Sequence, residues 1–99
     1  NLVINAMQAM PDGGDLTVTT QTDSTTKRVE LLVGDTGLGI PNENLSKIFD
    51  PFFTNKPEGT GLGLAIARQI LEKNQAAIRV SSKEGHGTVF RILFKTVEE

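Results

Sequence analysis

Two glycine-rich segments and a pair of asparagines are the residues whose types and spacing suggest chemistry. Residues 35–40 read Asp-Thr-Gly-Leu-Gly-Ile, residues 59–64 read Gly-Thr-Gly-Leu-Gly-Leu, and Asn1 and Asn5 precede both. Because glycine has no Cβ, it allows backbone N–H groups to approach a polyanion closely. An asparagine carboxamide offers a neutral oxygen of the kind that Mg²⁺ accepts. Together these residues predict a site for a magnesium–nucleotide complex.

The second glycine segment runs directly into a helix-periodic apolar stretch. The free N–H groups and the dipole at the start of that helix would face a phosphate. The segment does not fit the G-x-G-x-x-G spacing of dinucleotide-binding folds, because residue 64 is leucine, and it lacks the Gly-Lys-Ser/Thr ending of a P-loop. We therefore expect backbone contacts to phosphates from a different kind of loop, comprising Gly59, Thr60, Gly61, Leu62 and Gly63.

Asp35 follows an apolar strand-like run and precedes Thr-Gly. A carboxylate in this place can accept a hydrogen bond from the exocyclic amine of adenine, which guanine does not present at the same position. An aspartate before Thr-Gly is also a common turn former. The neighbouring Gly37, Gly39 and Ile40 favour the adenine interpretation, with the glycines bending the backbone beneath the base and Ile40 packing against it.

Composition restricts the possible classes of protein. The chain has 99 residues, a net charge of −2, no cysteine and five phenylalanines. This length corresponds to at most one domain, and the charge argues against a nucleic-acid partner, which requires a basic face. Disulfides and thiol chemistry are excluded. No apolar run reaches membrane-spanning length, so we expect a cytoplasmic segment, with any membrane anchor located elsewhere in a longer parent protein.

Hydrophobic periodicity predicts helices over residues 1–10 and 61–73 and a short helix near Asn42 as N-cap. In the second helix we expect Leu62, Ile66 and Ile70 to form one apolar row, with Ala67 and Leu71 beside it. Alternation predicts strands over residues 16–21, 29–35, 78–80 and 88–95, with residues 22–26 and 50–61 as loops. The pattern corresponds to the α+β class, with helices covering one face of an antiparallel or mixed sheet.

These motifs, in this order, resemble the ATP-binding domain of sensor histidine kinases. The resemblance extends from Asn1 to about Phe94 and comprises an N-box (1–9), two glycine boxes (35–40 and 59–63), an F-box (49–53) and a closing Gly-Thr-Val-Phe strand (87–90). The wider superfamily includes type II topoisomerases, heat-shock chaperone ATPases and mismatch-repair ATPases. It implies a two-layer α/β sandwich of the Bergerat type, with a mixed, largely antiparallel sheet. In the family the first helix begins earlier and a strand precedes it, so residues 1–99 are expected to be a fragment of a longer kinase.

The resemblance also assigns roles to individual residues. Asn5 matches the metal-binding asparagine, and Thr88 matches a threonine that helps to hold adenine, although it could equally be an ordinary strand residue. Asn1 occupies the position where ATPase branches of the superfamily carry a glutamate base. Asparagine has no useful basicity, so the site should bind ATP and hydrolyse it poorly. Lys56 lies in the segment that resembles the ATP lid, where it would reach the β- or γ-phosphate; a solvated loop lysine is the alternative.

The activity implied is transfer of the γ-phosphoryl group of ATP to a histidine, with Asn1 and Lys56 as candidate catalytic residues. The acceptor is expected on a separate dimerisation domain of the same, homodimeric protein, because His86, the only histidine, stands between two glycines. A response regulator receiver domain would then take the phosphoryl group. We expect residues 1–99 alone not to autophosphorylate.

Three alternatives remain open on the sequence. A non-catalytic nucleotide-binding regulatory module would use the same fold, and so would an anti-sigma-factor serine kinase, which the asparagine at position 1 disfavours. Asp35-Thr36-Gly37 also resembles the triplet of retroviral-type aspartic proteases. Those proteases are nearly all β, whereas residues 61–73 predict a helix.

Overall fold

The computed structural model describes residues 1–23, 25, 27–53 and 63–95. Within these ranges the chain forms two α-helices, a 3₁₀ helix and four strands. The helices are α1 (Leu2–Gln8) and α2 (Gly63–Lys73), and the 3₁₀ helix is η1 (Asn42–Asn44). The strands are β1 (Leu16–Asp23), β2 (Arg28–Asp35), β3 (Ala77–Lys83) and β4 (Gly87–Lys95).

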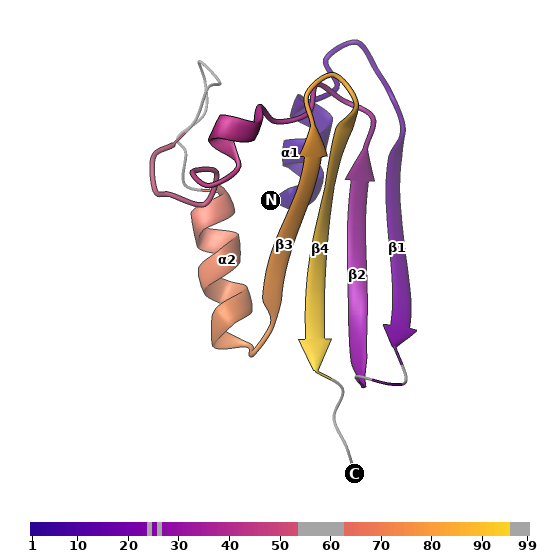
Figure 1. Cartoon of the computed structure of the whole chain (residues 1–99), viewed down its shortest axis with the longest axis vertical. Helices are drawn as coiled ribbons and strands as arrows, with labels where there is room; N and C mark the ends of the chain where they lie inside the picture. The colour runs from indigo at the N-terminus through magenta and orange to yellow at the C-terminus, as the bar shows by residue number, and fades with distance from the viewer. Residues whose placement is uncertain (24, 26, 54–62, 96–99) are drawn as a thin grey trace.

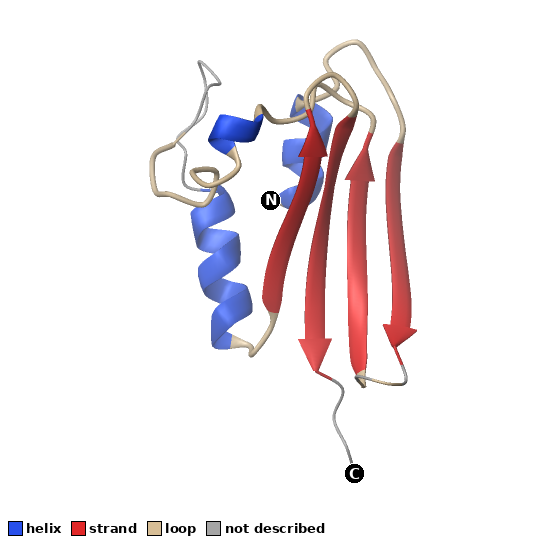
Figure 2. Cartoon of the chain, viewed as in Figure 1, coloured by secondary structure: helices blue, strands red, loops and turns tan. Residues whose placement is uncertain are grey.

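The strands form one sheet in the order β1-β2-β4-β3, and every pairing among the described strands is antiparallel. Both α-helices lie in a single layer beside this sheet (Figures 1 and 2). α1 contacts β2, and α2 contacts β3, so the helices leave β1 at the far edge. The fold is the α+β two-layer sandwich that the sequence predicted.

The core lies between the sheet and the helices. Val33 of β2 pairs with Phe90 of β4, which pairs in turn with Val80 of β3, so these side chains share one face. Phe90 is only 2% exposed. The ring of Phe49 meets it edge to face, with ring centroids 6.4 Å apart. This alternation of apolar side chains places the next residues on the same face, Asp35 and Thr88, at one end of the core.

Four local expectations were wrong. β1 continues through Asp23, so Thr22 belongs to the strand and not to the hairpin loop. The short helix is a single 3₁₀ turn with Pro41 as its N-cap, and Asn42 is its first residue. The first helix spans Leu2–Gln8 and is shorter than the expected residues 1–10. In α2 the apolar row is exposed at Ile66, which is 44% accessible, and at Ile70, which is 53% accessible, while Ala65 is buried.

α2 has two apolar rows, and sequence periodicity cannot tell which one meets the sheet. α1 likewise exposes Val3, Ile4 and Met7. None of the helices in the described part of the chain is long and apolar enough to cross a membrane.

Candidate functional site

The expected adenine-binding residues gather at one end of the sheet. β2 and β3 end there, and β1 and β4 begin there, at the top of Figure 1. Asp35, the last residue of β2, is 9% exposed, and its Oδ1 accepts a hydrogen bond from the Gly37 N–H at 2.9 Å. Among the described residues its second carboxylate oxygen has no hydrogen-bond partner. That oxygen is available to accept a hydrogen bond from a ligand.

Thr88 lies directly across from Asp35 in the β2–β4 pairing. It is 5% exposed, and its hydroxyl lies 2.8 Å from Ser82 Oγ. Opposite residues on one sheet face have Cβ atoms roughly 4.5–5.5 Å apart. The carboxylate of Asp35 and the hydroxyl of Thr88 are therefore near neighbours, as the adenine interpretation requires.

The first glycine loop is held by the protein's own backbone. The Leu38 N–H donates to Ala9 O at 3.0 Å, and the Gly85 N–H donates to Leu38 O at 2.7 Å. The loop is therefore clasped between the end of α1 and the β3–β4 turn. A Cβ on Gly37 would lie 2.3 Å from Ala9 O, and one on Gly39 would lie 2.2 Å from Lys83 O.

These close approaches explain why both positions are glycine, independently of any ligand. A third glycine completes the clasp, because a Cβ on Gly87 would lie 2.1 Å from Asp35 O. Ile40 is half-buried at the end of the loop, and its N–H donates to Ser82 Oγ at 2.7 Å. Backbone approaches and hydrogen bonds thus join the loop, the β3–β4 turn and the end of β2.

Asn1 lies beside the start of α2, and Asn5 follows it on α1. Asn5 is half-buried on α1, and its N–H donates to Asn1 O at 2.9 Å. An ideal Cβ on Gly63 would lie 3.4 Å from Asn1 Oδ1, so the carboxamide of Asn1 faces the first residue of α2. The fold thus brings the N-box to the helix that follows the second glycine box. Lys56, Gly59, Thr60, Gly61 and Leu62 lie outside the described residues.

The donor set is compatible with Mg²⁺ bound together with phosphates. Among the described residues no group of three His, Cys, Asp or Glu side chains could hold a metal ion. Mg²⁺ is ordinarily held by one or two protein oxygens, by waters and by substrate phosphates, without a dedicated protein cage. One carboxamide oxygen from Asn5 on α1 would fit that arrangement.

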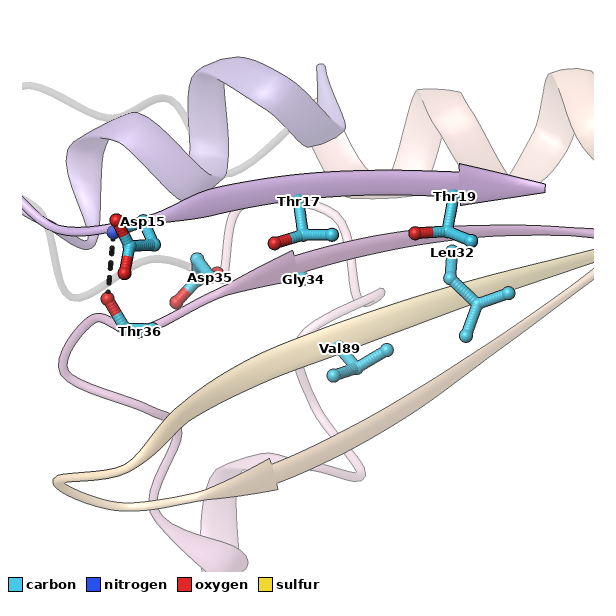
Figure 3. Close-up of a pocket in the computed structure, with 8 residues that line it drawn as sticks. All are labelled: Asp15, Thr17, Thr19, Leu32, Gly34, Asp35, Thr36 and Val89. Carbon is cyan, nitrogen blue, oxygen red and sulfur yellow. Dashed lines mark hydrogen bonds between the residues drawn. The ribbon is translucent and has the colours of Figure 1, made fainter.

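A shallow hollow of about 270 Å³ lies on the opposite face of the sheet. Thr17, Gly34 and Val89 line it, and these cross-strand neighbours alternate with the core-facing residues (Figure 3). Beside it, the Asp15 N–H donates to Thr36 Oγ1 at 3.0 Å. Of the predicted site residues only Asp35 borders this hollow, so it is separate from the site described above.

Ser82 is not among the site residues predicted from the sequence. It looks like any polar strand residue, and only its position in the β3–β4 hairpin, directly across from Thr88, reveals its contacts. Arg68 makes two contacts: its guanidinium pairs with Glu72 at 2.9 Å and lies 5.5 Å from the Phe49 ring centroid. His86 is exposed in the β3–β4 turn and is not part of a helix.

Comparison with known proteins places these features in a family. Residues 1–98 match the family described as histidine kinase-, DNA gyrase B- and HSP90-like ATPase. The chain is 47% identical over 92 residues to the sensor histidine kinase ZraS of Salmonella typhi, covering 93% of this chain and 20% of that protein. It is 41% identical to sporulation kinase E of Bacillus subtilis, again over 93% of this chain but only 12% of the relative.

Solved structures agree with this match. The catalytic domain of the histidine kinase ThkA in a nucleotide-free form superposes with a TM-score of 0.80 at 38% identity, covering 95% of this chain and 60% of that chain. The mycobacterial sensor histidine kinase MprB also gives a TM-score of 0.80, at 34% identity, covering 93% of this chain and 64% of that chain. The chain therefore spans only part of every relative named here.

Proposed function

Because the chain belongs to the histidine kinase-, DNA gyrase B- and HSP90-like ATPase family, we propose that residues 1–99 are the ATP-binding and catalytic part of a two-component sensor kinase. The choice of an adenine nucleotide rests on one observation: Asp35 and Thr88 are buried and lie side by side as a cross-strand pair of β2 and β4. The free carboxylate oxygen of Asp35 accepts a hydrogen bond from the exocyclic amine of adenine. Ile40 packs against the base, next to the loop of Gly37 and Gly39.

The triphosphate extends from the base towards α1 and the N-terminus of α2. Gly59, Thr60, Gly61, Leu62 and Gly63 supply backbone contacts, and Lys56 reaches the β- or γ-phosphate. Asn5 would hold Mg²⁺, which would neutralise charge on the phosphates. Asn1 contributes a carboxamide beside Gly63. A carboxamide cannot take a proton from water at neutral pH, which favours retention of the γ-phosphoryl group for another acceptor.

That acceptor is a histidine on a dimerisation domain of a homodimeric parent protein. The bond between the γ-phosphorus and the ADP oxygen breaks, a bond to the imidazole nitrogen forms, and the imidazole releases its proton. A response regulator receiver domain takes the phosphoryl group next. The domain works on the cytoplasmic side of its parent. The ZraS and sporulation kinases among the relatives support this assignment.

Of the alternative functions, one is disfavoured and one needs a separate experiment. An aspartic protease is disfavoured, because the match to the ATPase family covers residues 1–98 and α2 packs beside the sheet. A nucleotide-binding module without phosphotransfer would bind ATP equally well. Phosphotransfer separates the two: radiolabelled ATP should mark a separately supplied histidine-containing dimerisation domain from a relative, as an acid-labile phosphate.

The first test is calorimetric titration of a non-hydrolysable ATP analogue into the chain, with and without Mg²⁺. Binding at roughly 10–100 μM, or about −7 to −5.5 kcal/mol, is the expected result with Mg²⁺. Binding should weaken when Mg²⁺ is omitted and should be much weaker for the guanine analogue. A folded chain that bound neither nucleotide would overturn the proposal.

A further inference from the structure

Ser82 is the most connected polar side chain at this end of the sheet. Its hydroxyl accepts from the Ile40 N–H at 2.7 Å, donates to Gly87 O at 3.0 Å, and lies 2.8 Å from Thr88 Oγ1. Ser82 therefore touches the first glycine loop, the β3–β4 turn and the adenine-facing threonine at once. It is half-buried and lies behind Thr88 as seen from Asp35, because the strand order places β4 between β2 and β3.

A hydroxyl has one proton, and this determines the direction of the bond to Thr88. With the Ser82 proton on Gly87 O, the 2.8 Å bond between the two hydroxyls must be donated by Thr88. The Thr88 hydroxyl is then left with lone pairs only. Asp35, across the strand pair, is also an acceptor when ionised. The two groups that face the ligand would both accept hydrogen bonds.

We propose that Ser82 is a positioning residue that keeps the base-binding end of the site acceptor-only and thereby selects a 6-amino purine over a 6-oxo purine. This rests on the proposed function, since it concerns the same nucleotide site. An amino group can donate to either acceptor, whereas a carbonyl oxygen placed there meets two sets of lone pairs. Sites that pair with a particular donor reject the analogue that lacks it much more strongly than apolar pockets reject a change of size.

Removing the Ser82 hydroxyl should weaken this selection. In Ser82→Ala the Thr88 proton loses its acceptor, and the hydroxyl can rotate to donate to a 6-oxo group. The weaker selection should appear mainly as tighter binding of the 6-oxo purine nucleotide, with a smaller effect on the binding of ATP. A purely structural role for Ser82 would instead weaken both nucleotides by a similar factor.

The test compares non-hydrolysable analogues of ATP and inosine triphosphate by calorimetry, because hypoxanthine carries a 6-oxo group and a proton on N1 where adenine has a 6-amino group and an unprotonated N1, and it lacks the 2-amino group of guanine. In Ser82→Ala the ratio of the two dissociation constants should shrink about tenfold, the effect of a hydrogen bond of ordinary strength. The matched control is Ser81→Ala, since Ser81 is exposed on the opposite sheet face and should leave the ratio unchanged. Ser82→Thr, which retains a hydroxyl, should restore discrimination.

A double variant tests whether Ser82 acts through Thr88. In Thr88→Val the rotating hydroxyl is gone, so adding Ser82→Ala should not change the ratio further. An unchanged ratio in folded Ser82→Ala, or an equal loss of both nucleotides, would overturn the role of Ser82 while leaving ATP binding intact. A wild type that bound neither analogue would instead overturn the proposed function and this inference together.

Discussion

Asp35 and Thr88 are paired residues on β2 and β4, and both are almost completely buried, at 9% and 5% exposure. Each is held by a different segment. The Gly37 N–H fixes one oxygen of Asp35, and Ser82 fixes the hydroxyl of Thr88. Two polar groups at the end of an otherwise apolar core are costly to bury without partners. Hydrogen bonds from these segments offset that cost at both residues.

Asp35→Asn tests the acceptor directly. The carboxamide is nearly isosteric, and its oxygen can still accept from the Gly37 N–H, so the fold should survive. The ligand-facing atom would then be an NH₂ donor that opposes the adenine amine. We predict that binding of the ATP analogue weakens roughly 10–100-fold, as for loss of a hydrogen bond to a charged group. Calorimetry measures this, with circular dichroism as the check on folding. Wild-type affinity in the variant would exclude Asp35 as the base acceptor.

Asn5→Ala tests the proposed metal ligand. Without the carboxamide, adding Mg²⁺ should no longer strengthen binding of the ATP analogue, while affinity measured in EDTA should match the wild type. The readout is the ratio of dissociation constants with and without Mg²⁺. Asn74→Ala is the control, because Asn74 lies beyond the far end of α2 and bonds only to Ile70 O among the described contacts of its side chain. A full Mg²⁺ effect in Asn5→Ala would remove Asn5 from the metal site.

Gly87→Ala and Gly85→Ala separate backbone strain from close packing. Both glycines have positive φ, +101° and +81°, but a Cβ on Gly85 meets nothing within 4 Å, whereas one on Gly87 would lie 2.1 Å from Asp35 O. Gly85→Ala should cost only the left-handed backbone term, about 1–2 kcal/mol of unfolding free energy. Gly87→Ala should cost roughly 1–3 kcal/mol more, as overpacking does. Urea unfolding measures both, and equal costs would mean that the clasp can relax.

Arg68 combines an exposed ion pair with a contact to an aromatic face. The Arg68–Glu72 pair is i,i+4 on α2, with side chains 52% and 58% exposed. Such pairs contribute about 0.3–0.5 kcal/mol, so Glu72→Gln should hardly change stability. Arg68→Gln should cost more, by about 0.5–1 kcal/mol, because it also removes the cation from the Phe49 ring. Urea unfolding of both variants in low salt tests this, and identical costs would deny the ring contact any weight.

Much of this protein was readable from local sequence alone. The alternation of Val29, Leu31 and Val33 sets one face of β2, and it ends at Asp35 as predicted. Pro11 and Gly13 follow the end of α1 at Gln8, and residues 85–87 lie where β3 connects to β4. The order of the asparagine, glycine and phenylalanine motifs pointed to the family that the comparisons confirmed. These signals are strong because each depends on residues close together in the chain.

Tertiary structure decided the rest. Whether α2 packs through Ala65 or through Ile66 and Ile70 depends on which helical row meets β3, and both rows are apolar in sequence. The close approach of Gly37 to Ala9, and of Ser82 to both Ile40 and Thr88, exists only once β2, β3 and β4 are in register. Sequence alone thus determined the elements and the types of residue proposed for the site. Only the folded sheet could bring together groups that are far apart in the chain, such as Ile40 and Ser82, which are 42 positions apart, because such contacts depend on strand pairing and not on local periodicity.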